Sequence, residues 1–162
     1  MLAADPGVSI ANIAGEAGVD RRTVYRRFAS REELLAAIYE CRLEAIERAI
    51  EDARLGEAPV AVALHRYVEN IIGVNRMWPV ELTRMLSDDK VRARRDVSSR
   101  NVDTFLRRAA DEGLLRADAP EGWAAALLPQ LMHLVAQKMP GLNAAQAADV
   151  VVDTFLHGMG AS

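Results

Sequence analysis

Apolar residues recur along most of the chain at spacings of three and four positions, which is the repeat of an amphipathic α-helix. No segment shows the strict alternation of apolar and polar residues that is typical of a half-buried strand. The longest regular stripe follows a Ser30–Glu33 capping pair and ends at Leu55–Gly56. Its positions are Leu35, Ile38, Arg42, Ala45, Ile46, Ala49 and Ala53. The pattern therefore predicts an all-α fold.

Cap residues, glycines and prolines set the limits of the other predicted helices. Near the N-terminus, Ser9 caps a short helix that Gly18 ends, and Asp20 caps a second short helix from Arg21 to Phe28. Further helices are predicted at Pro59 to Met77, Pro79 to Leu86, Asp88 to Gly113, Glu121 to Lys138 and Asn143 to Met159, with Asn143 and Gln146 as a capping box. Because the sequence has no linker or internal repeat, we expect any domain boundary to lie within the Ser30–Leu55 helix.

The composition, 51% apolar and 27% charged residues in 162, is that of an ordinary globular chain. The one cysteine, Cys41, excludes an internal disulfide and suits a reducing cytoplasm. The first residues lack the basic and apolar regions of a signal peptide, and the longest uncharged stretch, Gly122 to Gln137, is too short to span a membrane. We therefore expect a cytoplasmic protein without a membrane partner.

The positive charge is concentrated near the N-terminus, although the formal net charge is −3. Five of the 20 basic residues fall between positions 21 and 31, and no acidic residue interrupts them. In the predicted helix, Val24 and Phe28 share one face, and arginines cover the opposite arc. A solvated charged face is the simplest interpretation of such a run. Two short helices joined by a glycine turn favour instead a helix-turn-helix, whose second helix enters the DNA major groove.

The stretch from Val8 to Leu35 closely resembles the DNA-binding motif of tetracycline-repressor (TetR) type regulators. It contains a cap serine, an Ile-Ala pair, an Ala-Gly-Val turn, a Thr-x-Tyr-x-x-Phe helix and a following Ser-basic-Glu, at the spacings of that family. The resemblance implies a homeodomain-like helix-turn-helix in residues 1–42 and an all-helical effector-binding and dimerisation domain in residues 43–162. Only Met1 to Ala4 precede Asp5-Pro6-Gly7, which looks like the last turn of the family's first helix. We therefore expect the DNA-binding domain to be truncated here. Either the native chain starts upstream, which we favour, or residues 1–30 are loosely held.

The same resemblance assigns the DNA contacts. Phosphate contacts are implied for Ser9, Tyr25 and Arg31, contacts at the phosphate or base edge for Arg21 and Thr23, and base contacts for Arg22, Arg26 and Arg27. The chemistry agrees, because arginine forms two hydrogen bonds with guanine, and hydroxyl groups bind phosphates. Arg22 and Arg27 stand where the family usually has a small residue and an aromatic residue or histidine, so the target sequence cannot be predicted. Val8, Ile13, Val24, Phe28 and Leu35 are predicted to form the core of the motif.

The rest of the chain carries no catalytic motif. It has no phosphate-binding glycine loop, His-Glu-x-x-His or cysteine pair, and its three histidines are far apart, so we predict neither an enzyme nor a metal or cofactor site. A pocket for a small apolar effector is the alternative to a plain core for a set of mostly apolar residues in the middle helices. That set is Tyr67, Asn70, Ile71, Val74, Trp78, Met85, Phe105, Trp123 and His133.

The last two predicted helices have apolar residues on more than one face, as an antiparallel four-helix interface between two subunits requires. The interface candidates are Leu127, Leu131, Leu134, Val135, Ala147, Val151, Phe155 and Met159. Packing of both helices within one chain is the alternative. Together these features predict a homodimeric regulator that binds double-stranded operator DNA, a repressor released by a small molecule. The competing hypothesis is a helical ligand-binding or assembly dimer that has lost DNA binding with its first helix.

Overall fold

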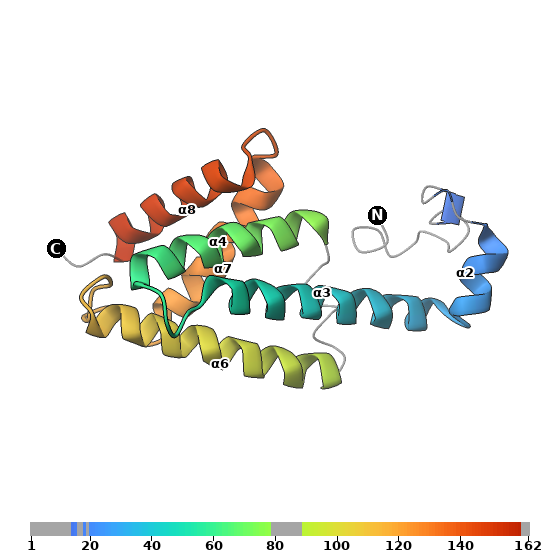
Figure 1. Ribbon diagram of the computed structural model, residues 1–162, viewed down its shortest axis with the longest axis horizontal. Coiled ribbons are helices and arrows are strands. Elements are labelled where there is room, and N and C mark those ends of the chain that lie inside the picture. Colours follow the sequence, from blue (N-terminus) through green and yellow to red (C-terminus); the bar gives the residue numbers. More distant parts are fainter. Residues whose placement is uncertain (1–13, 16–17, 19, 79–88, 160–162) are drawn as a thin grey trace.

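The computed structural model describes residues 14–15, 18, 20–78 and 89–159. Helices account for most of these residues, and the predicted all-α fold is confirmed. The helices labelled in Figure 1 are α2 (Arg21–Arg27), α3 (Arg31–Ala53), α4 (Val60–Met77), α6 (Asp89–Asp111), α7 (Trp123–Lys138) and α8 (Ala144–Met159). The helix predicted at Pro79 to Leu86, and most of the one capped by Ser9, lie outside the described residues.

The predicted caps explain where three of these helices begin. The Asp20 carboxylate accepts the Arg22 N–H at 2.6 Å, and the Ser30 hydroxyl accepts the Glu33 N–H at 3.1 Å. Ahead of α8, the Asn143 side chain accepts the Gln146 N–H at 2.9 Å, and the Gln146 side chain accepts the Asn143 N–H at 3.1 Å. This reciprocal pair is a complete capping box, as predicted.

Helix α3 ends earlier than predicted and without a glycine. Its last residue is Ala53, and Arg54 takes the left-handed conformation at φ 52°. The Arg108 side chain of α6 stabilises the turn that follows. It donates from Nη1 to the Leu55 carbonyl at 2.6 Å and from Nη2 to the Ala58 carbonyl. The end of α3 is therefore defined by a contact from a distant helix, which no local pattern predicts.

Helix α4 is the centre of the bundle and contacts α3, α6, α7 and α8. Its buried residues are paired at intervals of four and form a wide apolar face: Ala63, Leu64, Tyr67, Val68, Ile71 and Ile72. Phe105 of α6 and Phe155 of α8 are fully buried in the same core. The helical body is thus a continuous packed interior around α4.

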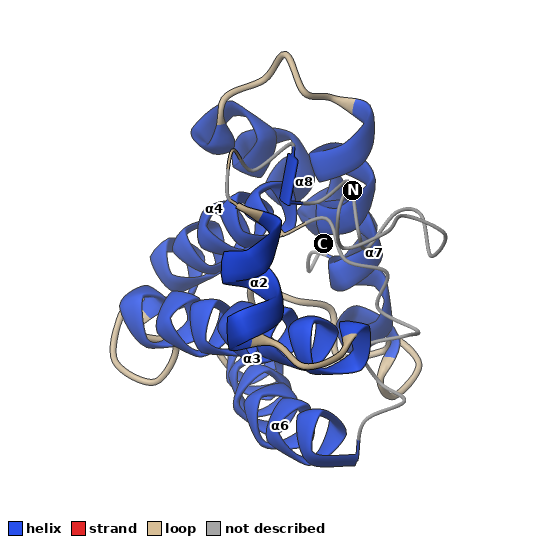
Figure 2. Cartoon of the chain, turned by 90° about the vertical axis from the view of Figure 1, so that its right-hand side faces the viewer, coloured by secondary structure: helices blue, strands red, loops and turns tan. Residues whose placement is uncertain are grey.

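Helix α3 connects this body to the N-terminal part of the chain. Its C-terminal half packs in the main core, while its N-terminal half extends beyond the bundle and carries α2 at the end of the molecule (Figure 1). In Figure 2, which faces that end, α2 is the helix nearest the viewer. The arrangement places α2 away from α4, α7 and α8 and exposes most of its surface.

Candidate nucleic-acid interface

The exposed helix α2 is held on α3 by one small apolar contact. None of its residues is fully buried, and only Val24 and the following Phe28 are shielded, by Leu34, Leu35 and Ile38 of α3. This packing confirms the predicted core positions of Val24, Phe28 and Leu35. Val8 and Ile13, the other two predicted positions, lie outside the described residues.

The turn before α2 is formed at Gly18, where the sequence predicts it. Gly18 has φ +64°, a left-handed conformation that strains other residues, and its N–H donates to the Gly15 carbonyl at 3.3 Å. Ala14, in the helical turn before it, is buried, although this position was not predicted as core. Gly18 therefore ends one helical segment and allows α2 to start at Arg21.

The arginines of α2 are exposed and carry unneutralised charge. Within the described ranges, no carboxylate lies within 4 Å of Arg21, Arg22, Arg26 or Arg27. Elsewhere in the chain, ion pairs with nearby carboxylates are formed by Arg48, Arg54, Arg92, Arg94, Arg108 and Arg116. The contrast means that α2 presents a concentrated positive charge that no carboxylate among the described residues neutralises.

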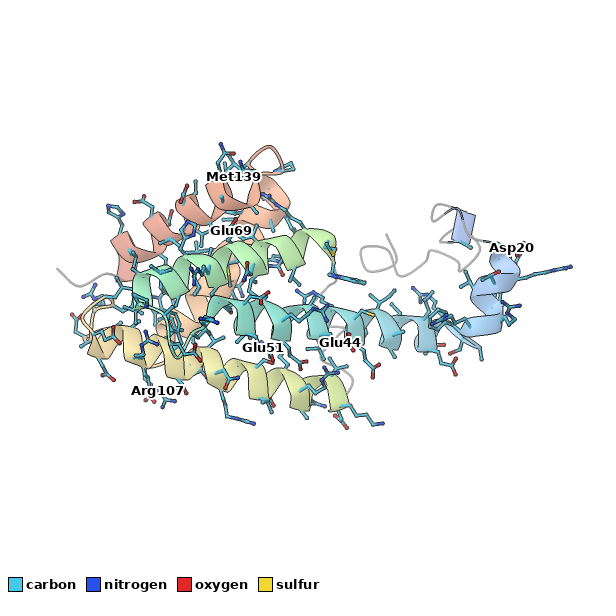
Figure 3. All side chains as sticks on the ribbon, viewed as in Figure 1. Asp20, Glu44, Glu51, Glu69, Arg107 and Met139 are labelled. Atoms are coloured by element: carbon cyan, nitrogen blue, oxygen red, sulfur yellow. The ribbon has the colours of Figure 1, made fainter. Side chains whose placement is uncertain are left out.

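Two of the acidic residues close to α2 are engaged with the backbone, while Glu32 in the first turn of α3 is exposed. The Asp20 carboxylate caps α2, and Glu33 Oε2 accepts the Ala29 N–H at 2.7 Å. Figure 3 shows Asp20 at the tip of the molecule, beside the side chains that project from α2. Because both carboxylates are occupied in this way, they cap helices and leave the arginine side chains available.

Two further predicted DNA contacts differ in their surroundings. Tyr25 is 44% exposed, so its ring is not part of the core, and the Arg21 guanidinium lies over it at 5.3 Å from the ring centroid. Arg31 is half-buried, and its Nε and Nη2 have no hydrogen-bond acceptor among the described residues. Thr23 is exposed on α2, and Ser9 lies outside the described residues. The structure therefore brings together seven of the eight predicted DNA-contacting residues in one region.

The predicted effector residues do not gather around one cavity in the described part of the chain. Tyr67, Ile71 and Phe105 are buried in core packing, while Trp123 and His133 are exposed on α7. The other described members, Asn70, Val74 and Trp78, are half-buried, and Met85 lies outside the described residues. Asn70 Nδ2 donates to the Ala49 carbonyl at 3.1 Å, which links α4 to α3. Burial, followed by the charge of Asp103, raises the pKa of Tyr67 to about 12.

An open hollow of about 580 Å³ lies elsewhere, between α4, α8 and the turn after α6. It contains none of the predicted effector residues. Its lining is His65, Gly113, Leu114, Asp149, Val152, Asp153, Leu156 and His157. Its histidines are already engaged, since His65 Nε2 lies 2.8 Å from Asp149 Oδ1 and His157 Nδ1 lies 3.3 Å from Asp153 Oδ1.

The prediction for the dimer interface needs correction at four positions. Ala147, Val151 and Phe155 of α8 and Val135 of α7 are buried in the core of their own chain, so their side chains leave no surface for a second copy. Leu127 and Leu131 are half-buried, Leu134 is 53% exposed, and the side chain of Met159 is outside the described residues. Sequence reasoning missed Val150, which is 41% exposed on α8.

A buried cation on α3 was also missed as a special position. Arg42 Nη2 donates to Asn75 Oδ1 at 2.9 Å, and its Nε donates to the Trp78 carbonyl at 3.4 Å. Burial, and then the nearby charge of Arg95, lowers the pKa of Arg42. The signal was present in the sequence, since Arg42 is the one charged residue in an otherwise apolar stripe. Its hydrogen bonds connect the middle of α3 to the end of α4.

Other kinds of site receive no support from the described residues. None of the described helices is both long and apolar enough to cross a membrane. In the same part of the chain, no group of three or more His, Cys, Asp or Glu side chains is arranged to hold a metal ion. The charged end formed by α2 and the start of α3 is therefore the most distinctive feature of the described surface.

Comparison with known proteins also points to a DNA-binding regulator. The family model of bacterial regulatory proteins of the tetR family matches residues 6–38. The HTH-type transcriptional repressor LfrR of Mycolicibacterium smegmatis is 29% identical over 165 residues, which cover 98% of this chain and 84% of LfrR. The similarity to LfrR thus extends through the helical body and is not limited to the DNA-binding motif.

Solved structures show the same fold. The TetR-like regulator LfrR from Mycobacterium smegmatis, in complex with proflavine, has a TM-score of 0.76 at 27% identity and covers 97% of this chain and 88% of LfrR. The ketosteroid regulator KstR2 of Mycobacterium tuberculosis has a TM-score of 0.79 at 18% identity, covering 97% of this chain and 87% of KstR2. The second likeness, at that identity, concerns the fold alone.

Proposed function

Because the chain belongs to the TetR family of bacterial transcriptional regulators, we propose that it is a repressor that binds operator DNA as a homodimer and is released by a small apolar effector. The family is one of DNA-binding repressors. A repressor of this kind acts on the chromosome and so works in the cytoplasm. The observation that supports DNA binding best is the group of unpaired arginines on α2.

The arginines of α2 have the position that a recognition helix needs. They are exposed at the end of the molecule, on a helix whose apolar side is docked on α3. On a wheel of about 100° per residue, Arg26 lies opposite the core face formed by Val24 and Phe28, with Arg22 and Thr23 beside it. We propose that these three residues face the base edges. Ser9 and Arg31 are proposed to contact phosphates, as the resemblance implies. Arg27, which the resemblance gives as a base contact, lies on the flank of α2 and is proposed to reach the bases from the groove wall.

The second copy of the chain is proposed to dock on the outer faces of α7 and α8. Leu134 and Val150 are exposed apolar residues there, as is Trp123 at the start of α7, and Leu127 and Leu131 are only half-buried. Dimerisation is typical of the family. Burying these side chains between two subunits would form a four-helix interface and place two copies of α2 on one duplex.

The effector is proposed to be a small apolar molecule that enters among α3, α4, α6 and α7. The predicted lining residues that are at least half-buried lie on or next to α4 and α6, with Tyr67 and Asn70 as polar groups in apolar surroundings. The LfrR structure contains proflavine, which makes this aromatic compound a suitable first probe. We expect proflavine to bind the full chain and to weaken its DNA binding in a competition titration.

DNA binding is tested by selecting duplexes with a randomised centre and then titrating salt against the selected and a scrambled duplex. If each subunit neutralises about three or four phosphates, the plot of log K against log salt should have a slope of about −5 to −7 for the dimer. The readout is fluorescence anisotropy of the labelled duplex. Absence of salt-dependent binding to any duplex would contradict the proposal.

Arg26→Ala is the informative variant, and Arg107→Ala is its matched control. Removing a base contact should cost about 1 to 3 kcal/mol on the selected duplex and blur the preference at one base position. Arg107 is also exposed but belongs to α6, far from Asp20 and α2 (Figure 3). Arg107→Ala should therefore leave the affinity for both duplexes unchanged. Equal effects of the two substitutions would show that the contribution is only net charge.

The interface is tested by Leu134→Asp, with Val62→Asp on α4 as the control. Val62 is 43% exposed and Leu134 is 53% exposed, so neither substitution should disturb the core. Leu134→Asp should shift the protein towards monomer in sedimentation velocity, because it places a charge in an apolar contact. A Leu134→Asp variant that stays dimeric at low micromolar concentration would rule out this face.

A further inference from the structure

Arg21 and Tyr25 form a cation–π pair on α2. The Arg21 guanidinium carbon lies 5.3 Å from the centroid of the Tyr25 ring, which is within the range of a cation–π contact. The two residues are four positions apart and therefore neighbours on one side of the helix. Both are exposed, and neither has a carboxylate or hydrogen-bond partner among the described residues. The aromatic ring is thus the group that orients this arginine.

The pair lies on the flank of α2 and not on the side opposite the core. On the helical wheel, Arg21 and Tyr25 are about 40° and 80° from the centre of the core face between Val24 and Phe28. Arg26 is about 180° from that centre. A helix about 10 to 12 Å wide fills a major groove of about 12 Å, so its outermost side meets the base edges and its flanks meet the phosphate walls.

We propose that the ring of Tyr25 positions Arg21 to bind a backbone phosphate, so that this pair supplies affinity and not sequence preference. The inference rests on the proposed DNA-binding function and refines it. The contact with the ring holds the guanidinium by its charge and does not require its N–H groups to donate to an acceptor, so they can donate to phosphate oxygens. It also restricts a long side chain before binding, which lowers the entropy lost when the phosphate contact forms.

The first part of the test concerns Arg21 itself. The probe is a labelled duplex of mixed sequence, because a phosphate contact does not depend on the bases. Arg21→Ala should reduce the steepness of the salt dependence by about 0.9 for each subunit, or about 1.8 for the dimer. It should leave the base preference of the selected duplexes unchanged. A changed base preference with an unchanged salt slope would overturn the phosphate assignment.

The second part isolates the positioning role of the ring. Tyr25→Phe keeps the ring and removes the hydroxyl, while Tyr25→Leu removes the ring, so the comparison of these two variants excludes any contact of the hydroxyl. With Arg21 present, Tyr25→Leu should bind the mixed duplex about two- to fivefold more weakly per subunit than Tyr25→Phe. In the Arg21→Ala background this difference should disappear.

Arg27→Ala provides the control background, since Arg27 lies on the opposite flank of α2 with no aromatic neighbour among the described residues. There the difference between Tyr25→Phe and Tyr25→Leu should remain. If Tyr25→Phe and Tyr25→Leu differ in affinity by the same factor in the Arg21→Ala background, the Tyr25 ring does not act by positioning Arg21. That result would leave the DNA-binding function itself intact. If the unmodified chain binds neither the mixed nor a selected duplex at low salt, the DNA-binding function fails, and this inference fails with it.

Discussion

Replacing Leu34 by alanine tests whether α2 is held in place by one small cluster. Leu34 is buried between α2 and α3, and Val24 and Phe28 are half-buried around it. Truncating a buried leucine costs about 2 to 5 kcal/mol, and the cost is lower where neighbours move into the space. The neighbours of Leu34 are only partly enclosed, so we expect about 2 to 3 kcal/mol, confined to the contact between the two helices.

Leu64→Ala is the matched substitution in the main core. Leu64 on α4 is fully buried, so the cavity it leaves closes less readily and should cost about 3 to 5 kcal/mol. Amide hydrogen exchange distinguishes the two variants. Leu34→Ala should accelerate exchange in α2 and the first turns of α3 and leave α4 and α8 as in the unmodified chain, while Leu64→Ala should lower protection throughout the bundle.

The consequence for DNA binding follows from the population of the docked form. The apparent affinity falls in proportion to the fraction of molecules in which α2 is docked, so it drops only when the lost energy approaches the local stability. Equal loss of protection across α2, α4 and α8 in Leu34→Ala would refute this reasoning. It would show that the DNA-binding end and the body unfold as one unit.

Two further tests concern local energetics. Asn143→Ala should lower the free energy of unfolding in urea by about 1 kcal/mol, because it removes the cap of α8. Gln146→Ala removes only the return hydrogen bond of the capping box and should cost less than half as much. Equal costs of the two substitutions would contradict the role of Asn143 as the cap. The pKa of Tyr67 is raised to about 12 by burial, with a smaller effect of Asp103, so the folded state holds the phenol proton more tightly. This contribution is complete below pH 10 and is lost as the pH rises towards 12, so about 1.4 kcal/mol disappears between pH 9 and pH 11. Tyr67→Phe should lack this alkaline loss when urea unfolding is measured at both pH values, and an unchanged loss would locate the titration elsewhere.

The sequence was informative wherever a local rule decides the structure. Caps such as Asp20, Ser30 and Asn143 were predicted because they satisfy the free N–H groups of the next few residues. The positions of Arg22 and Arg26 on α2 were predicted because helical geometry alone puts them on the side away from Val24 and Phe28. Neither inference needs a contact from a distant part of the chain.

Features that depend on tertiary packing were less predictable. Apolar periodicity shows that a face is buried but not whether its own chain or a second copy covers it, which is why Val151 and Phe155 were assigned to a dimer interface. The end of α3 depends on Arg108 from α6 and therefore falls before the glycine that was expected to end it. For the same reason the sequence cannot tell whether the candidate effector residues, chosen as mostly apolar positions in the middle helices, line a pocket or only fill the core.

Helix α3 explains how one continuous element serves both ends of the molecule. Its 23 residues extend about 34 Å at 1.5 Å per residue, from the Leu34 cluster under α2 to Ala53 in the main core. Side-chain contacts tie it to the body along the way, in addition to the Asn70–Ala49 hydrogen bond. Arg42 bonds to the end of α4, and Arg94 of α6 forms a two-pronged pair with Glu47 at 2.7 and 3.2 Å.

These contacts set the angle at which α2 is presented. Because α2 touches the described body only through α3, a shift of α4 or α6 that breaks the Arg42 or Arg94 contacts would rotate α3 and move α2 with it. A rotation of about 10° about the C-terminal end of α3 would move its far end by about 6 Å, given its length of about 34 Å. For the dimer proposed above, that displacement would exceed the tolerance of a hydrogen bond to a base edge several-fold, so a rotation of this size in α3 would be sufficient to move each α2 out of its half-site.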